Sequence, residues 1–149
     1  MLRWAKQLLP PEFLGSHIAS ATSHSSGRTH DLSFRAATAI FGHLGIEWDI
    51  TSIDDDELPE LKEWIDFYKE NRQFLNTGTG VRADRADESL WLHGVVSQDR
   101  HHALFSLVAR YRSPMSPRGT IRFPGLDTEM TYHVRPGQVG QPVEGLVAA

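Results

Sequence analysis

Hydrophobic and polar positions follow two different patterns along the 149-residue chain. In residues 1–76, apolar positions recur mostly at helical spacing between two short apolar runs, whereas from Val81 onward they alternate with a period of two. A helical period between short apolar runs is typical of βα units, and a period of two is typical of antiparallel strands. The pattern predicts an α/β piece followed by an all-β piece.

The first predicted βα unit contains a long polar loop. A short buried strand is expected at Phe13–Ile18, followed by a Ser-, His- and Thr-rich loop at Ser20–Asp31. That loop exceeds the ~2–6 residues usual for a βα connection, and long loops are often functional. Asp31 or Thr29 is expected to cap the next helix, and Gly45 is expected to end it. The core face of this helix is predicted to comprise Phe34, Ala37, Ile40, Phe41 and Leu44.

A second βα unit follows directly. Alternating apolar and acidic residues predict a strand at Ile46–Ile50, and the capping and acidic residues at 51–57 predict a helix that runs to about Leu75. The apolar stripe of this helix is wide enough to be buried on more than one side: Leu58, Leu61, Trp64, Ile65, Phe67, Tyr68, Phe74 and Leu75. Because two parallel strands cannot close a barrel or bury both faces of a sheet, residues 1–76 are expected to be an incomplete α/β domain.

The second piece is predicted to be a small antiparallel β-sandwich at residues 87–136, after a linker at 77–86 and before a flexible tail at 137–149. Its expected strands are Leu90–Val96, Ala103–Tyr111, Thr120–Phe123 and Met130–Val134, the last two around a turn at Pro124–Asp127.

Composition excludes several classes of function. The net charge is −4, with −4 in residues 1–86 and zero in residues 87–149, and the basic residues are scattered, which argues against a nucleic-acid-binding surface. No apolar run approaches the ~20 residues that span a bilayer, and the N-terminus has no signal-peptide pattern. The absence of cysteine excludes disulfides and fits a reducing compartment, so we expect a cytoplasmic location.

Five segments carry a resemblance to a known family: Leu14–His17, His24–Arg35, Phe41–Asp49, Tyr68–Arg72 and Phe123–Leu126. Together they resemble bacterial α-galactosidases of glycoside hydrolase family 36, and the similarity covers nearly the whole chain. The resemblance implies an N-terminal β-sandwich, a central (β/α)₈ TIM barrel and a C-terminal β domain in the intact enzyme. This chain is similar only to the last βα units of the barrel and the C-terminal domain.

The resemblance also limits the chemistry of this chain. The family hydrolyses terminal α-galactosides with retention, using an aspartate nucleophile and an aspartate acid/base in Lys-x-Asp and Ser-Asp type motifs. Neither motif is present. Asp31 and the acids at 54–56 are expected at helix starts, and Glu47 and Asp49 flank Trp48 in a strand. We therefore assign no catalytic residue, no metal and no cofactor.

The polar loop is the part expected to lie near the sugar. Barrel active sites are built from loops at the C-terminal ends of strands, so Ser16, His17, His24 and Arg28 are predicted at the rim of the substrate pocket. In the alternative interpretation, Gly15, Ser16 and His17 pack inside the barrel and Arg28 holds the loop by hydrogen bonds.

Three other sites are alternatives to this interpretation. His17, His24, His30 and Asp31 offer metal-binding groups, but their spacing matches no compact ligand motif. A triad with Ser16 or Ser25 as nucleophile lacks the glycine pattern of a nucleophile elbow. Trp91, Phe105 and Tyr111 offer an aromatic platform for a sugar on the predicted sandwich, but aromatic residues at a period of two are more often core residues.

The sequence thus predicts the C-terminal fragment of an α-galactosidase, inactive alone, whose partners are the upstream barrel, the α-galactoside and, in the full enzyme, further copies of itself. A standalone non-catalytic module that binds carbohydrate or protein is the alternative, although such a module should not expose two orphan βα units. A third possibility keeps the enzyme class but changes the sugar, for example to an α-N-acetylgalactosaminide.

Overall fold

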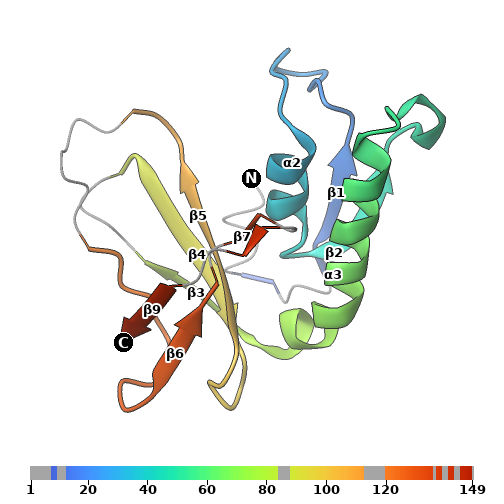
Figure 1. Cartoon of the computed structure of the whole chain (residues 1–149). Coiled ribbons are helices and arrows are strands. Elements are labelled where there is room, and N and C mark those ends of the chain that lie inside the picture. Colours follow the sequence, from blue (N-terminus) through green and yellow to red (C-terminus); the bar gives the residue numbers. More distant parts are fainter. Residues whose placement is uncertain are drawn as a thin grey trace. The chain divides into compact units, whose positions relative to one another are not determined.

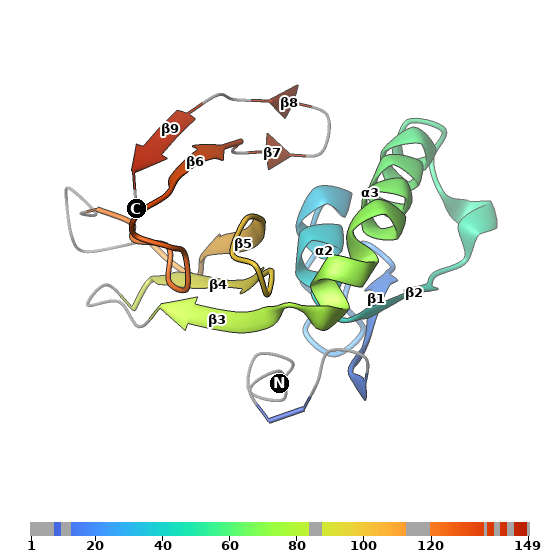
Figure 2. The ribbon, with the colours of Figure 1, turned by 90° about the horizontal axis from the view of Figure 1, so that it is seen from below.

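The computed structural model describes residues 8–9, 13–83, 88–112, 120–135, 137–138, 141–142 and 145–148. The chain divides into two compact units, one formed by residues 1–76 and 135–144 and the other by residues 77–134 and 145–149. Figure 1 and Figure 2 together label the α-helices and strands of both units. Within the described residues, no helix has the length and apolar character needed to cross a membrane.

The first unit contains two βα units in succession. Its elements are β1 (Gly15–Ala19), α2 (Leu32–Ala39), β2 (His43–Glu47), the 3₁₀ turn η2 (Ile50–Ser52) and α3 (Glu57–Thr77). Strands β1 and β2 pair in parallel, with Gly15 opposite His43 and Ala19 opposite Glu47. Both helices lie on the same side of this strand pair (Figure 2). The predicted order of strand, helix, strand and helix is confirmed.

The core of this unit lies between the strand pair and the helices. Its buried apolar residues are Ile18, Leu32, Ala36, Ala39, Ile40, Phe41, Leu61, Trp64 and Leu75. The prediction of a buried Phe34 is wrong, because its side chain is 42% exposed. Leu58, predicted on the buried stripe of α3, is 53% exposed.

The boundary between α2 and β2 differs from the prediction. The helix ends at Ala39, so Leu44 and Gly45 belong to β2, and the strand begins three residues before the predicted Ile46. The cause is a close approach of two backbone segments. The His43 N–H donates to the Leu14 carbonyl at 2.8 Å, and a Cβ at Gly42 would lie 2.6 Å from that same oxygen.

The second unit is built from antiparallel strands. Strands β3 (Thr79–Ala83), β4 (Leu90–Val96) and β5 (Ala103–Ala109) form one sheet in that order, and β6 (Thr131–Val134) pairs with β9 (Gly145–Ala148). The prediction of β4 is confirmed, and β5 ends two residues before the predicted Tyr111. The predicted strand at Thr120–Phe123 is wrong, because these residues are not in a strand.

Strands also occur where a linker and a flexible tail were expected. Part of the predicted linker, residues 77–86, is strand β3. The predicted tail, residues 137–149, contains β7 (Gly137–Gln138), β8 (Gln141–Pro142) and β9. These short strands are defined by pairing with another strand rather than by alternation of apolar residues, so a local hydrophobic pattern does not reveal them.

One face of the β3–β4–β5 sheet is covered by residues 120–130. The Phe123 ring lies 4.7 Å from the Phe105 ring, and an added Cβ at Gly125 would lie 3.0 Å from Val81 and 3.2 Å from Val96. Gly125 adopts a positive φ of 84°, which glycine accepts without strain. This cover lies on the face of the central strand that carries the buried side chains of Leu90, Leu92 and Val96, whereas the buried Val95 lies on the opposite face.

Candidate active-site rim

The two faces of the β1–β2 pair have different environments. Alternate residues of a strand point to opposite faces, and Ser16 and Ile18 are almost completely buried on the face that meets the helices. The opposite face carries Gly15, His17, Ala19, His43, Gly45 and Glu47. On that face both histidines and Glu47 are exposed, so the face is polar and open.

His17 lies across this open face. Its Nδ1 is 3.6 Å from Glu47 Oε2, and the two side chains are 50% and 77% exposed. An added Cβ at Gly45 would lie 2.6 Å from His17 Cδ2, so the glycine makes room for the ring. Because the pair is exposed and long, it adds little to stability, but it orients an imidazole on the open face.

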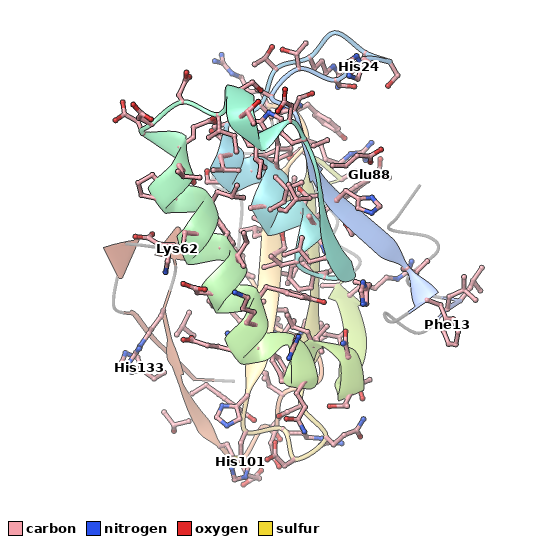
Figure 3. The ribbon with its side chains drawn as sticks, turned by 90° about the vertical axis from the view of Figure 1, so that its right-hand side faces the viewer. Phe13, His24, Lys62, Glu88, His101 and His133 are labelled. Carbon is pink, nitrogen blue, oxygen red and sulfur yellow. The ribbon has the colours of Figure 1, made fainter. Side chains whose placement is uncertain are left out.

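The loop after β1 folds on itself as a small hairpin, which we call the hairpin lobe (Ser20–His30). The Ser23 N–H donates to the Arg28 carbonyl at 2.9 Å, and the His30 N–H donates to the Ala21 carbonyl at 3.0 Å. The Gly27 N–H donates to the Ser23 carbonyl at 2.8 Å, and Gly27 adopts a positive φ of 66°. The lobe lies at the C-terminal end of β1, since His24 and Phe13 mark opposite ends of that strand in Figure 3.

The four predicted rim residues do not form one cluster. Ser16 is buried on the helix side of β1, His17 lies on the open face, and His24 and Arg28 are exposed on the hairpin lobe. Arg28 helps to close the lobe through its backbone carbonyl, which accepts the Ser23 N–H. Whether any of these side chains touches a sugar stays a prediction.

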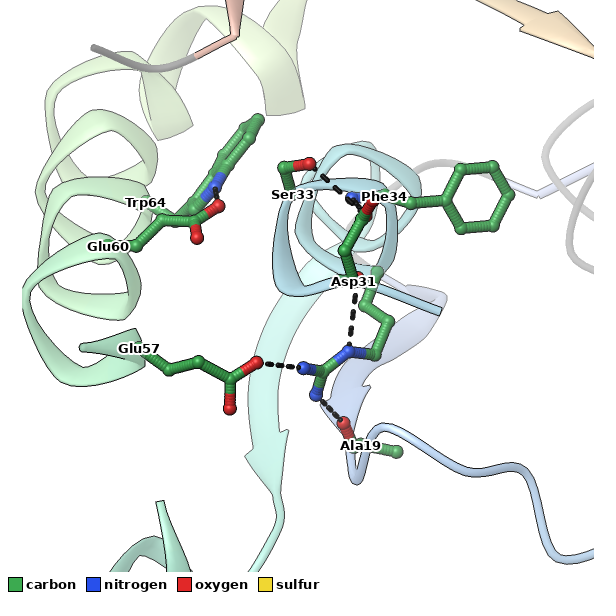
Figure 4. A network of polar contacts seen from close by, with 8 residues as sticks. Ala19, Asp31, Ser33, Phe34, Glu57, Glu60 and Trp64 are labelled. Carbon is green, nitrogen blue, oxygen red and sulfur yellow. Dashed lines mark hydrogen bonds and ion pairs between the residues drawn. The ribbon is translucent and has the colours of Figure 1, made fainter. Parts of the chain in front are cut away.

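A residue that the sequence analysis did not select, Arg35, forms the main polar network of this unit (Figure 4). Its NH1 donates to the Ala19 carbonyl at 2.6 Å and its Nε to the Asp31 carbonyl at 3.2 Å. Its NH2 forms an ion pair with Glu57 Oε1 at 2.9 Å, and its guanidinium lies 4.5 Å from the centre of the Trp48 ring. The Arg35 side chain is only 8% exposed.

This network joins both strand ends to both helix starts. Ala19 is the last residue of β1, Trp48 follows β2, Asp31 is the N-cap of α2, and Glu57 begins α3. The contacts of Arg35 with Ala19 and Glu57 span 16 and 22 residues in sequence, so no local sequence motif predicts them. The only sequence signal is an arginine in the first turn of a helix, where acidic residues are favoured.

Two of the aspartates at this end of the unit serve local structure. Asp31 Oδ1 accepts the Phe34 N–H at 2.8 Å and so caps α2, which confirms one of the two predicted caps. Asp49 accepts hydrogen bonds from the Thr51 hydroxyl at 2.6 Å and the Thr51 N–H at 3.0 Å. These two bonds, the hydroxyl bond first, lower the pKa of Asp49 below its ordinary value.

The alternative sites are not assembled. Among the described residues, no three His, Cys, Asp or Glu side chains are grouped as a metal site, and His30 is stacked on Phe34 at 4.7 Å. Trp91 lies opposite Val108 and Phe105 opposite Gly94, so the register places Trp91 and Phe105 on opposite faces of the sheet. The hypothesis of one aromatic platform that includes both rings is therefore wrong.

Tyr111, the third aromatic residue of that hypothesis, is not a core residue. Tyr111 is 51% exposed, and the Arg110 guanidinium lies 5.7 Å from its ring and 4.3 Å from the Trp91 ring. The Arg110 guanidinium covers one face of the Trp91 ring and so removes that face from stacking with a sugar.

The comparisons with known proteins decide the family. The melibiase family model matches residues 2–78 of the chain, which is more than half of it. The chain belongs to the melibiase family. It is 38% identical to an α-galactosidase of Escherichia coli over 133 residues, which cover 89% of this chain and 19% of that protein. It is 31% identical to the α-galactosidase AgaA of Geobacillus stearothermophilus over 84% of this chain and 17% of that protein.

Solved structures of melibiases have the same fold over the same part. The α-galactosidase of Lactobacillus brevis matches 97% of this chain and 20% of its own with a TM-score of 0.80 and 26% identity. Geobacillus stearothermophilus AgaA in complex with raffinose matches 87% of this chain and 18% of its own with a TM-score of 0.78 and 27% identity. The chain thus spans about a fifth of the length of these relatives, and the resemblance to glycoside hydrolase family 36 is confirmed.

Proposed function

We propose that this chain supplies the C-terminal part of a retaining α-galactosidase: the last two βα units of a (β/α)₈ barrel and the antiparallel β domain that follows. The observation that carries the proposal is the asymmetry of the β1–β2 pair. Both helices lie on one side (Figure 2), and the other side carries the exposed His17, His43 and Glu47. In a (β/α)₈ barrel the helices form the outer ring and the opposite face of each strand points inward.

The strand edges support the same assignment. The described strands add no third strand to either edge of the β1–β2 pair. Parallel strands occur almost only in sheets with both faces covered, so the pair fits a place among further barrel strands. We propose that the remaining part of the barrel is the partner of this surface.

The catalytic carboxyls belong, in this proposal, to that remaining part. Retaining hydrolysis needs two carboxyl groups about 5–5.5 Å apart across the scissile bond. Asp31 and Asp49 are committed to backbone hydrogen bonds, and Glu57 is paired with Arg35. We infer that the chain is inactive alone, needs no cofactor and acts in the cytoplasm.

The hairpin lobe is the part that we place beside the substrate. It follows the C-terminal end of β1, where barrel loops build the active site, and it carries His24 and Arg28 on its exposed surface. His17 lies on the inward face, and buried Ser16 is assigned to packing. We propose α-galactosides of the raffinose and stachyose type as substrates, because structures of Geobacillus AgaA contain these sugars.

A chimera tests this proposal. The segment of the Escherichia coli α-galactosidase that aligns with this chain is replaced by the matching residues of this chain, and hydrolysis of p-nitrophenyl α-galactoside is measured. We expect the chimera to hydrolyse the substrate and the Escherichia coli protein without that segment to be inactive. A soluble, folded chimera without activity, beside an active parent, would argue against the proposed function.

A further inference from the structure

The hairpin lobe depends on its base for its position. The backbone hydrogen bonds of Ser23, Gly27 and His30 all lie inside the lobe and fix only its internal shape. The chain enters the lobe from Ala19 and leaves it at Asp31. Contacts at these two residues therefore decide how the lobe is oriented relative to β1.

Arg35 contacts both ends of that base. Its guanidinium donates to the carbonyls of Ala19 and Asp31, which lie 16 and four residues away in sequence. The same guanidinium is held in place by Glu57 and by the face of Trp48. One planar group therefore fixes the lobe to the ends of both strands and to the start of α3.

The chemistry of this position favours arginine over lysine. A guanidinium offers several N–H donors in a fixed plane and also stacks on an aromatic ring, whereas an ammonium is a compact charge without a plane. The site uses the Nε, NH1 and NH2 groups of Arg35 and the face of its plane. Lysine retains the attraction to Glu57 but cannot reproduce the remaining contacts together.

We propose that Arg35 is a positioning residue, which fixes the hairpin lobe at the C-terminal end of the strands and thereby sets the affinity for the α-galactoside. The part of this proposal that concerns the sugar rests on the proposed function. The part that concerns the lobe does not, and it is tested on the 149-residue chain itself.

The first test is residue-resolved amide hydrogen exchange with Arg35→Met, Arg35→Lys and the control Arg72→Met, which changes an exposed arginine of α3. In Arg35→Met we expect the amides of Ser23, Gly27 and His30 to exchange about ten- to a hundredfold faster, while amides at the centre of α3 change less. Compared with Arg35→Met, Arg35→Lys should recover most of the melting temperature of the unchanged chain. It should recover less of the protection of the lobe amides against exchange. Arg72→Met should change neither.

Two results would overturn the proposal. One is unchanged lobe exchange in both Arg35 variants, and the other is an equal acceleration in the lobe, α2 and α3, which indicates a general structural role. If Arg35→Met does not fold, Arg35→Lys gives the same comparison between the lobe and the helices.

The second test uses the active chimera. We expect Arg35→Lys in the chimera to raise KM for p-nitrophenyl α-galactoside about tenfold with a smaller change in kcat, because a misplaced lobe weakens binding more than chemistry. An unchanged KM would overturn the link to the sugar. An inactive parent chimera would count against the proposed function alone, and hydrogen exchange would still decide the role of Arg35.

Discussion

Two sheets of this chain, the antiparallel β3–β4–β5 sheet and the parallel β1–β2 pair, differ in how completely their strands are paired and buried. The central strand of the antiparallel sheet, β4, has paired strands on both edges and buries Leu90, Leu92, Val95 and Val96. The parallel pair β1–β2 buries only Ser16 and Ile18 among its ten residues, and its open face carries His17 and Glu47. The antiparallel sheet resembles a domain core, whereas the parallel pair resembles a part cut from a larger sheet.

The difference teaches where each unit obtains its stability. In the second unit, the sheet and the segment 120–130 form the core together. In the first unit, the buried apolar residues lie mostly on and after the helices, and Arg35 ties the strand ends to them. Substitutions in the two sheets should therefore have unequal effects.

The largest contrast is expected from truncating one apolar side chain in each sheet. Leu92→Ala removes a side chain that is 2% exposed and should lower the free energy of unfolding of the second unit by about 2–5 kcal/mol. Ile46→Ala changes a residue of β2 that is 37% exposed and should cost about 1 kcal/mol or less. Urea denaturation followed by the NMR signals of each unit measures both free energies of unfolding. Equal losses in the two variants would contradict the proposed difference between the two sheets.

A second contrast comes from adding a methyl group to one glycine in each sheet. A Cβ at Gly94 would lie 2.3 Å from the Leu104 carbonyl oxygen, so Gly94→Ala must separate two backbones and should cost about 1–3 kcal/mol. The three atoms nearest to a Cβ at Gly45 all belong to the half-exposed His17 ring, which can rotate away. Gly45→Ala should therefore cost clearly less in thermal denaturation, and this small loss should vanish in the background of His17→Ala.

A third prediction concerns the loop ends of the first unit. Asp31→Ala removes the cap on the Phe34 N–H and should lower stability by about 1 kcal/mol. Asp55→Ala is the matched control, because Asp55 is exposed just before α3. A control that lost as much stability as Asp31→Ala would contradict the capping role.

The smallest effect is a pH dependence that both units share. The Thr51 hydroxyl and then the Thr51 N–H lower the pKa of Asp49, and the Ser97 hydroxyl and then the His101 N–H lower that of Asp99. Because the folded pKa lies below the unfolded value of about 3.9, the stabilisation is present above that value and is lost as the pH falls through the folded pKa. Carboxyl NMR titration of Thr51→Val should show a raised pKa for Asp49 and an unchanged pKa for Asp99.

The sequence predicted what depends on local pattern. The two βα units, the cap at Asp31 and the strand Leu90–Val96 follow from periodicity and side-chain chemistry. The start of β2 at His43 was missed because it depends on the contact between Gly42 and Leu14. Strand β3 was missed because Thr79–Ala83 lacks an apolar alternation and is defined by its pairing with β4.

The candidate site was predicted only in part. The long polar loop was located correctly, but its hairpin shape follows from backbone hydrogen bonds that composition does not encode. The role of Arg35 was missed because its partners lie up to 22 residues away. The separation of Ser16 from His17 follows from strand alternation once β1 is known to have one buried face.

The most direct test of the central claim is the hydrolysis of p-nitrophenyl α-galactoside by the purified 149-residue chain. The claim is that this melibiase segment carries an open barrel face without the catalytic carboxyl pair. It predicts no release of p-nitrophenol above the blank. Turnover that persists through repurification and co-elutes with the chain would contradict it, and Glu47, the exposed acid on the open face, would then be the first residue to mutate.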